Sequence, residues 1–324
     1  MPLDRRARRL LDMLAAGARP DANPTASDRR AALVALARIG DDVSTPVTIE
    51  DLEIPAPTGR LPIRLYAPTE SNRSLTPGLV FFHGGGWVAG GLETHDGLCR
   101  RLCEASGARI IAVDYRLAPE HPFPAGLTDC LTAINWVSNH ARMLGLDRWR
   151  LAVGGDSAGG GLAAAATQIA RDAGGPAIAL QVLICPILDV ARRTGSRAMF
   201  REGHFIGADA FARDLADYAG RGAAFDDPRL SPLHATAFGG LPPALIHTAE
   251  FDPFRDEAEA YAEALRDAGV AVTGVRHPGM IHYFYALARA IPYAEAAAAV
   301  IGAQMRAALG AARPGESAAA ALAS

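Results

Sequence analysis

One glycine-rich stretch, residues 151–161 (LAVGGDSAGGG), constrains the fold of this chain more than any other. The apolar residues at its start predict a buried strand, and the alanine-rich residues after it predict a helix. Between them, GDSAG at 155–159 matches G-x-S-x-G, a tight strand-turn-helix elbow that exposes the hydroxyl of Ser157. A Cβ at Gly155 or Gly159 would collide with neighbouring backbone in so tight a turn. Because the pattern also arises by chance in a chain with 33 glycines, the flanking strand and helix carry the prediction.

Composition and charge narrow the classes of protein. A chain of 324 residues is long enough for one large α/β domain, or for a core domain with a smaller one. The net charge is −3, and no basic stripe interleaved with aromatic residues appears, which argues against a nucleic-acid partner. No apolar run approaches the roughly 20 residues of a membrane span. The arginine-rich start lacks the apolar stretch of a signal peptide, so we expect a cytoplasmic protein without stable membrane insertion.

The four cysteines do not follow the spacing of a metal-binding motif. Cys99 and Cys103 would share one helix face, a geometry that does not favour a disulfide bond. We therefore expect reduced thiols in the core at all four positions, Cys99, Cys103, Cys130 and Cys185.

The order of predicted elements favours a mostly parallel sheet of about eight strands covered by helices on both faces. Two amphipathic helices, at 3–16 and 27–39, precede an antiparallel pair of strands at 47–54 and 60–66. Strands and helices then alternate to the end of the chain. Besides the strand of the elbow, the predicted strands are 78–82, 108–113, 179–184, 244–248 and 271–276, and the predicted helices are 92–106, 125–144, 254–268 and 292–312.

One segment interrupts this alternation. Residues 188–240 separate two strands by more than an ordinary loop and include a helix-like stretch at 209–218. We expect this segment to pack over the functional site together with the N-terminal helices. The expected organisation is N-terminal cap helices at 1–45, a catalytic domain at 46–187 and 241–312, a cap insertion at 188–240, and a disordered tail at 313–324.

A serine at an elbow is a weak nucleophile unless a base and an orienting carboxylate accompany it. In a sheet of this design the partners belong on loops at the carboxyl ends of later strands. The loop after the strand at 244–248 offers three acids: Glu250, Asp252 and Asp256. We favour Asp252, which comes early in the loop and before Pro253, with Glu250 as the alternative. Asp256 falls in the first turn of the next helix, where it favours the helix dipole.

The base is expected in the loop after the strand at 271–276. His277 stands at the end of that strand beside Pro278, whereas His282 follows a loop containing Gly279 that can bring it over the elbow. We therefore favour His282. The thirty residues from Asp252 to His282 correspond to about one loop-helix-strand-loop unit, and the order serine, aspartate, histidine is the order typical of this architecture.

A second glycine-rich loop follows the strand at 78–82, where residues 83–87 read HGGGW. Three glycines allow the backbone to approach a ligand and to present N–H groups to a developing oxyanion. We predict donors at Gly85 and Gly86, together with the N–H of Ala158. Gly84 is expected to shape the turn and His83 to brace the loop.

Taken together, these motifs resemble those of the bacterial hormone-sensitive-lipase-like esterases (family IV), over about residues 45–312. The segments that carry the resemblance are 83–86 (HGGG), 115–125 (YRLAPEHPFPA), 155–160 (GDSAGG), 252–257 (DPFRDE) and 279–282 (GMIH). The resemblance implies an α/β-hydrolase fold with a helical cap, a Ser157/Asp252/His282 triad and an oxyanion hole at Gly85, Gly86 and Ala158. It also implies hydrolysis of short- to medium-chain esters without a metal or organic cofactor, and it suggests a homodimer.

The sequence departs from the family pattern at two positions, with Phe254 where leucine is usual and Tyr283 where glycine is usual. Both are expected to reshape the pocket wall and hence the substrate preference. The same triad would also serve an amidase, a peptidase or an acyltransferase, which sequence alone does not separate. A non-catalytic binding protein on this scaffold has no need of a base, so the triad argues against it.

Overall fold

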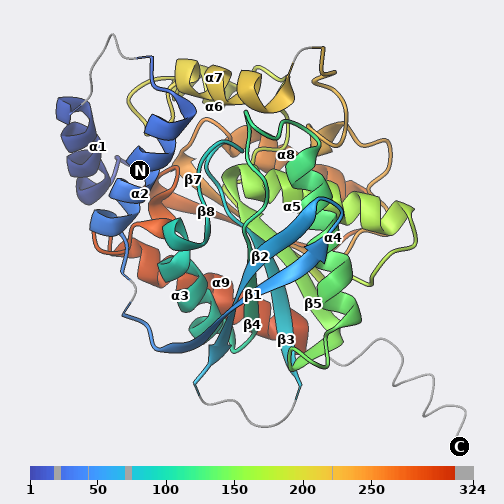
Figure 1. Cartoon of the computed structure of the whole chain (residues 1–324). Coiled ribbons are helices and arrows are strands. Elements are labelled where there is room, and N and C mark those ends of the chain that lie inside the picture. Colours follow the sequence, from blue (N-terminus) through green and yellow to red (C-terminus); the bar gives the residue numbers. More distant parts are fainter. Residues whose placement is uncertain (18–22, 43, 70–74, 221, 311–324) are drawn as a thin grey trace, which may run out of the picture.

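A computed structural model describes residues 1–17, 23–42, 44–69, 75–220 and 222–310. Within them, eight strands form one sheet in the order β1-β2-β4-β3-β5-β6-β7-β8 (Figure 1). The neighbours from β4 to β8 are parallel, whereas β1 pairs antiparallel with β2 and β2 with β4. The α/β class and the antiparallel start predicted from the sequence are therefore confirmed. The strands are β1 (Val47–Ala56), β2 (Gly59–Pro68), β3 (Thr76–Phe82), β4 (Arg109–Val113), β5 (Leu146–Asp156), β6 (Leu180–Ile184), β7 (Ala244–Phe251) and β8 (Val272–Ile281).

Helices cover both faces of the sheet. The α-helices are α1 (Arg5–Gly17), α2 (Ala26–Gly40), α3 (Asp96–Ser106), α4 (Ala125–Asn139), α5 (Ser157–Asp172), α6 (Gly195–Met199), α7 (Ala208–Ala219), α8 (Arg255–Asp267) and α9 (Tyr293–Gly310). Short 3-10 turns lie at Leu92–Thr94, Pro232–His234 and Phe284–Ala286. The segment expected to be a tail, 313–324, lies outside the described residues.

Strand β3 shows how the sheet separates two hydrophobic cores. Its side chains alternate between the faces, as strand geometry requires. Val80 and Phe82 join the core that contains residues of α4, α5 and α8. Leu79 and Phe81 join the core that contains residues of α3 and α9. Because all four side chains are fully buried, β3 reads as a continuous apolar run, as central parallel strands do.

Several predicted boundaries were wrong. Strand β7, predicted to end at residue 248, runs on to Phe251, so Glu250 lies in the strand and not in the loop after it. The helix predicted over 125–144 ends at Asn139, where His140 Nδ1 meets the carbonyl oxygen of Trp136 at 2.8 Å and closes the last turn. The segment predicted as a loop after residue 276 is instead part of β8, which runs on to Ile281. A register shift between Ala249 and Phe251 keeps β7 and β8 paired across it.

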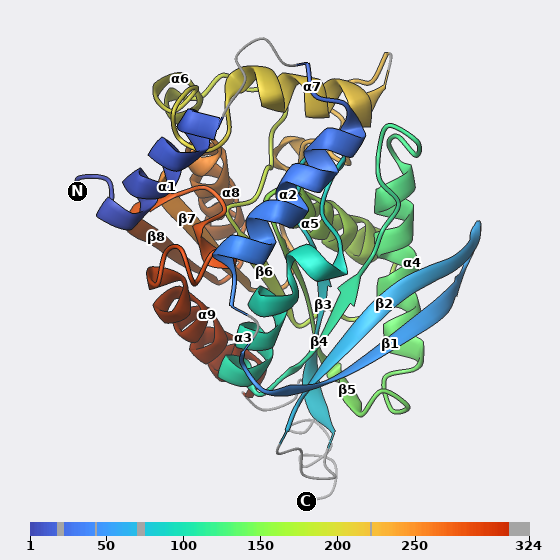
Figure 2. The same cartoon turned by 60° about the vertical axis from the view of Figure 1, so that its left-hand side comes forward.

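Four helices gather at the end of the sheet where the parallel strands finish. In both views α1, α2, α6 and α7 lie on this side of the molecule (Figures 1 and 2). The guanidinium of Arg29 on α2 bridges Asp214 and Asp217 on α7, so segments nearly two hundred residues apart are joined by ion pairs. Helix α6 was not predicted; its five residues are too few for a helical period to be recognised.

The buried histidines of β7 and β8 form a hydrogen-bonded chain. His247 Nδ1 lies 2.9 Å from His277 Nε2, His247 Nε2 lies 2.9 Å from Gln304, and His277 Nδ1 lies 3.2 Å from the Tyr293 hydroxyl. Burial lowers the pKa of His247 to about 3, with the charge of His277 adding to the effect, and lowers the pKa of His277 to about 4. Both rings are therefore neutral in the folded protein at neutral pH.

We expect this pair to make the protein sensitive to acid. Below about pH 6.5 these histidines are protonated in the unfolded chain but stay neutral in the folded protein. The free energy of unfolding should therefore fall as the pH drops toward 4. Between pH 7 and 5 the loss should be about 2 kcal/mol per histidine. Urea unfolding at pH 7 and pH 5 should show a smaller loss for His247→Gln/His277→Gln than for the wild type. His140→Gln, at an exposed position, is the control, and an equal loss in all three proteins would contradict the prediction.

Among the residues that the structure describes, no helix combines the length and the apolar character needed to cross a bilayer. The four cysteines are free and buried, as the sequence predicts.

Candidate active site

Ser157 stands where β5 turns sharply into α5. Its φ is +52°, in the left-handed region that a non-glycine residue rarely adopts, which marks a strained turn. A Cβ on Gly155 or on Gly159 would collide with the carbonyl oxygen of Phe82 on β3. The two glycines therefore allow β3 and α5 to pack close enough for the serine to stand at the sheet's edge.

Three side chains from three separate loops meet at this point. His282 Nε2 lies 2.9 Å from Ser157 Oγ, and His282 Nδ1 lies 2.7 Å from Asp252 Oδ2. Their relative exposures are only 6% for Ser157, 2% for His282 and 0% for Asp252, so the line of hydrogen bonds is largely shielded from water. Asp252 Oδ1 also accepts from the backbone N–H of Phe254 at 2.8 Å, which fixes the carboxylate. The structure thus brings the favoured acid and base together with the serine.

The other candidate acids and the other candidate histidine have partners elsewhere. Glu250 Oε2, near the end of β7, accepts from the N–H of Gly279 in β8 at 2.7 Å, which ties together the ends of the two strands that precede Asp252 and His282. Asp256 Oδ2 accepts from the N–H of Ser196 at 2.7 Å. His277 belongs to the buried chain with His247 described above.

The loop at 83–87 lies beside the serine. Gly85 has a φ of +122°, and a Cβ there would collide with the carbonyl of Ala89, so the sequence HGGG is needed for this turn. The carbonyl oxygen of Gly85 accepts from the N–H of Ala89 at 2.9 Å, which fixes the turn. Gly85 and Gly86 line the same pocket as Ser157, and Ala158 occupies the first turn of α5. All three predicted donors are therefore grouped around the serine.

The buried carboxylate of Asp156 holds the glycine loop and the segment after His282 in place. This role was not predicted from the sequence. The carboxylate accepts from the N–H of Gly84 at 2.9 Å and from the hydroxyl of Tyr285 at 2.9 Å, and it lies 3.2 Å from His95 Nε2. Burial favours the neutral acid, but the charge and hydrogen bond of His95 and the hydroxyl of Tyr285 prevail and lower the pKa of Asp156. One carboxylate thus links the glycine loop, the elbow and the segment after His282. The position of Asp156 immediately before Ser157 is the sequence feature that could have indicated this role.

Among the residues that the structure describes, Cys185 is the one near the triad that could add a metal ligand to Asp252 and His282. Its thiol, an Asp252 oxygen and a His282 nitrogen lie within 4.8 Å of one another. Burial raises the pKa of the Cys185 thiol, and the negative charge of Asp252 raises it further, so the sulfur is held as a thiol. Because a metal ligand must be a thiolate and His282 and Asp252 already bind each other, the arrangement suits a hydrogen-bonded relay better than a metal centre.

The serine and histidine open into a cavity of about 330 Å³ with mostly apolar walls. Both departures from the family pattern line it. The ring of Phe254 packs edge-on against the His282 ring, with 5.3 Å between the ring centroids. The Tyr283 ring stacks on the Phe205 ring, with 5.5 Å between their centroids. The lining residues are Leu14, Arg29, Ala32, Leu33, Leu36, Gly85, Gly86, Ala89, Ser157, Ile187, Phe205, Ile206, Ala210, Phe211, Asp214, Phe254, His282 and Tyr283.

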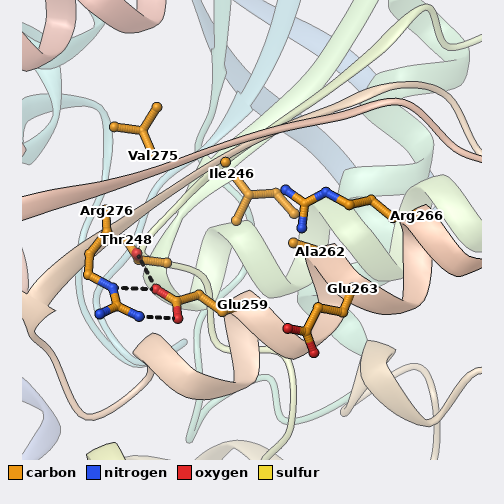
Figure 3. Close-up of a pocket in the computed structure, with 9 residues that line it drawn as sticks. Ile246, Thr248, Glu259, Ala262, Glu263, Arg266, Val275 and Arg276 are labelled. Atoms are coloured by element: carbon orange, nitrogen blue, oxygen red, sulfur yellow. Dashed lines mark hydrogen bonds and ion pairs between the residues drawn. The ribbon is translucent and has the colours of Figure 1, made fainter.

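A second hollow, of about 310 Å³, lies between α8 and the strands β7 and β8 (Figure 3). Its charged groups neutralise one another in part, since Glu259 binds Arg276 in two hydrogen bonds and also accepts from the hydroxyl of Thr248. None of the residues brought together around Ser157 lines it. The candidate active site is therefore the cavity lined by Ser157 and His282, not this second hollow.

A parallel sheet with a serine elbow, a hydrogen-bonded histidine and acid, and a glycine loop beside them defines an α/β hydrolase. Comparison with known proteins agrees. The chain belongs to the alpha/beta hydrolase fold family, whose model matches residues 79–286, and the resemblance to the hormone-sensitive-lipase-like group is confirmed.

Similar proteins include two esterases of Mycobacterium tuberculosis. The chain is 47% identical to carboxylic ester hydrolase LipN over 70% of its own length and 61% of that of LipN. It is 39% identical to esterase LipI over 79% of its own length and 80% of that of LipI. Among solved structures, ester-hydrolase EH1AB1 from the metagenome of Lake Arreo, complexed with a bipyridine phosphonate derivative, superposes with a TM-score of 0.92. It is 41% identical and covers 95% of this chain and 99% of its own.

Proposed function

We propose that this chain is a serine carboxylesterase that hydrolyses short- to medium-chain carboxylic esters through an acyl-enzyme on Ser157. The observation that carries the proposal is the continuous hydrogen-bonded line Asp252–His282–Ser157 opening into an apolar cavity of about 330 Å³. That volume is at the lower end of those typical of ligand pockets, which favours small acyl and alcohol groups. The relatives named above are themselves ester hydrolases.

In the proposed reaction, His282 Nε2 removes the proton of Ser157 Oγ while that oxygen attacks the ester carbonyl carbon. The carbonyl oxygen becomes an oxyanion held by the N–H groups of Gly85, Gly86 and Ala158, each contributing about 3 kcal/mol to the transition state. His282 then donates its proton to the departing alkoxide oxygen. A water molecule repeats the sequence on the acyl-enzyme, which releases the acid and restores Ser157. Asp252 holds the imidazole in the required tautomer and stabilises its charged form.

The test combines turnover with covalent labelling. At pH 8 the protein should hydrolyse p-nitrophenyl acetate and butyrate faster than the octanoate, and p-nitroacetanilide much more slowly. A p-nitrophenyl phosphonate should inactivate it with loss of one p-nitrophenolate, and mass spectrometry of the digest should place the phosphonyl group on Ser157. A faster reaction with the anilide would favour an amidase with the same triad. Labelling at another residue would refute the assignment of the nucleophile.

We further propose that residues 1–45 and 188–240 form a cap over a catalytic domain of residues 46–187 and 241–312. In support, the cavity wall takes Leu14 and Leu33 from the first segment and Phe205 and Phe211 from the second. The expectations of a cytoplasmic location, of a homodimer, and of activity without a metal or cofactor stand on the sequence and its resemblance. Gel filtration of the purified chain tests the dimer, and assays in the presence of a chelator test the independence from metal.

A further inference from the structure

The cavity that holds Ser157 is apolar except at one point on its wall away from the triad. Arg29 of α2 and Asp214 of α7 are the charged residues that line it within the described part of the chain. Asp214 lies against the glycine loop: a Cβ placed on Gly86 would collide with Asp214 Oδ2. Since Gly86 is one of the proposed oxyanion donors, this carboxylate oxygen borders the loop that is proposed to hold the ester carbonyl.

The two oxygens of Asp214 have different surroundings. Oδ1 accepts from Arg29, whose second terminal nitrogen is held by Asp217. The described residues supply Oδ2 with no hydrogen bond. Burial raises the pKa of Asp214 to about 6 against the opposing charges of Arg29 and Arg213, so the group is ionised at pH 8. The terminal nitrogens of Arg29 hold Asp214 and Asp217, and its Nε–H donates to the carbonyl oxygen of Thr25, so every nitrogen of Arg29 already has a partner. Asp214 Oδ2 is the polar side-chain atom of this pair that has no such partner among the described residues.

We propose that Asp214 Oδ2 is a specificity determinant that accepts a hydrogen bond from a hydroxyl or N–H group carried by the ester close to its carbonyl. The inference rests on the proposed esterase function and narrows its substrate class to esters bearing a donor on the acyl or the alcohol side. The charges of Arg29 and Arg213 offset part of the Asp214 charge beside the oxyanion loop, which reduces the repulsion between this carboxylate and the developing oxyanion.

Isosteric esters test the proposal in two arms, measured by pH-stat at pH 8. The acyl arm compares ethyl 3-hydroxybutanoate with ethyl 3-methylbutanoate and ethyl 3-methoxybutanoate. The alcohol arm compares 2-hydroxyethyl acetate with propyl acetate and 2-methoxyethyl acetate. A methoxy group withdraws electrons much as a hydroxyl does but cannot donate a hydrogen bond. Rates are divided by those of hydroxide hydrolysis to remove intrinsic reactivity.

We expect the wild type to prefer the hydroxy ester over both analogues by about tenfold in kcat/KM in one arm, the size of a hydrogen bond to a charged acceptor. Asp214→Leu should remove the preference, measured as the ratio of kcat/KM for the hydroxy ester to kcat/KM for the methyl isostere. The matched control is Asp217→Leu, one turn along the same helix and bound to the same arginine but absent from the cavity wall, which should keep the preference within twofold.

Three outcomes would overturn the inference. The wild type could treat hydroxy and methoxy esters alike in both arms, a result that does not depend on the folding of any variant. Asp214→Leu could retain the preference. Asp217→Leu could lose it equally, which would assign the effect to the joining of α2 and α7 rather than to contact with substrate. Hydrolysis of none of the six esters would instead refute the esterase function itself.

Discussion

Replacing Ser157 with alanine is expected to lower kcat for p-nitrophenyl butyrate by about 10⁶-fold, the effect of removing the nucleophile in another serine hydrolase. Without Oγ there is no atom to form the acyl-enzyme, and His282 Nε2 loses the partner that lies 2.9 Å away. The residual rate should come from the oxyanion donors and substrate binding alone. Alanine removes a single oxygen at a position that is already nearly buried, so the elbow should persist.

The measurement is kcat at saturating ester, accompanied by thermal unfolding and by labelling with the phosphonate. Ser106→Ala is the matched control, because Ser106 is also a buried serine but its hydroxyl binds the carbonyl of Leu102 within α3. That variant should keep its activity within about twofold. A folded Ser157→Ala protein with wild-type turnover would show that another group is the nucleophile.

The second large effect is expected for Asp252→Asn, which should lower kcat by about 10⁴-fold, as the corresponding change does in another triad enzyme. The present carboxylate accepts the Nδ1 proton of His282 at 2.7 Å, which leaves Nε2 as the base facing Ser157. An amide at that position can donate to Nδ1 and stabilise the opposite tautomer, in which Nε2 carries the proton and cannot act as a base.

Asp256→Asn is the control for this change, since Asp256 lies on the same segment and accepts from the N–H of Ser196. It should cost only stability, about 1 kcal/mol, and leave kcat nearly unchanged. Should Asp252→Asn keep kcat within tenfold of the wild type while folded, the acid would not be Asp252. Glu250, tied to the N–H of Gly279, would then be the next residue to replace.

Local patterns predicted the elbow and the glycine loop because their constraint lies within a few residues. The close approach of β3 and α5 excludes a Cβ at positions 155 and 159, and the positive φ of Gly85 excludes most side chains there. Both constraints require glycine, so both motifs can be recognised in the sequence. The strand and helix order followed from periodicity, and it was sufficient to place the loops after β7 and β8 at the same edge as the elbow.

The extent of β8 was not predictable in the same way. The proline and glycine at 278 and 279 indicate a break, yet the pairing with β7 resumes at Phe251 and Ile281 after a register shift. The shift is accompanied by a hydrogen bond between Glu250 and the N–H of Gly279, which comes from another strand. Such a contact depends on a residue about thirty positions away and leaves no local signal.

The amino-acid sequence by itself determined the α/β class, the family and the three side chains most suited to the chemistry, because these depend on short-range sterics and on the order of elements. Only the tertiary structure showed that Asp156 joins three loops, that His247 and His277 are a neutral buried pair, and that Asp214 lies beside Gly86. These features arise from contacts between distant segments, whose electrostatics depend on burial. Burial depends on the packing of the whole molecule, so the identity of a single residue does not predict it.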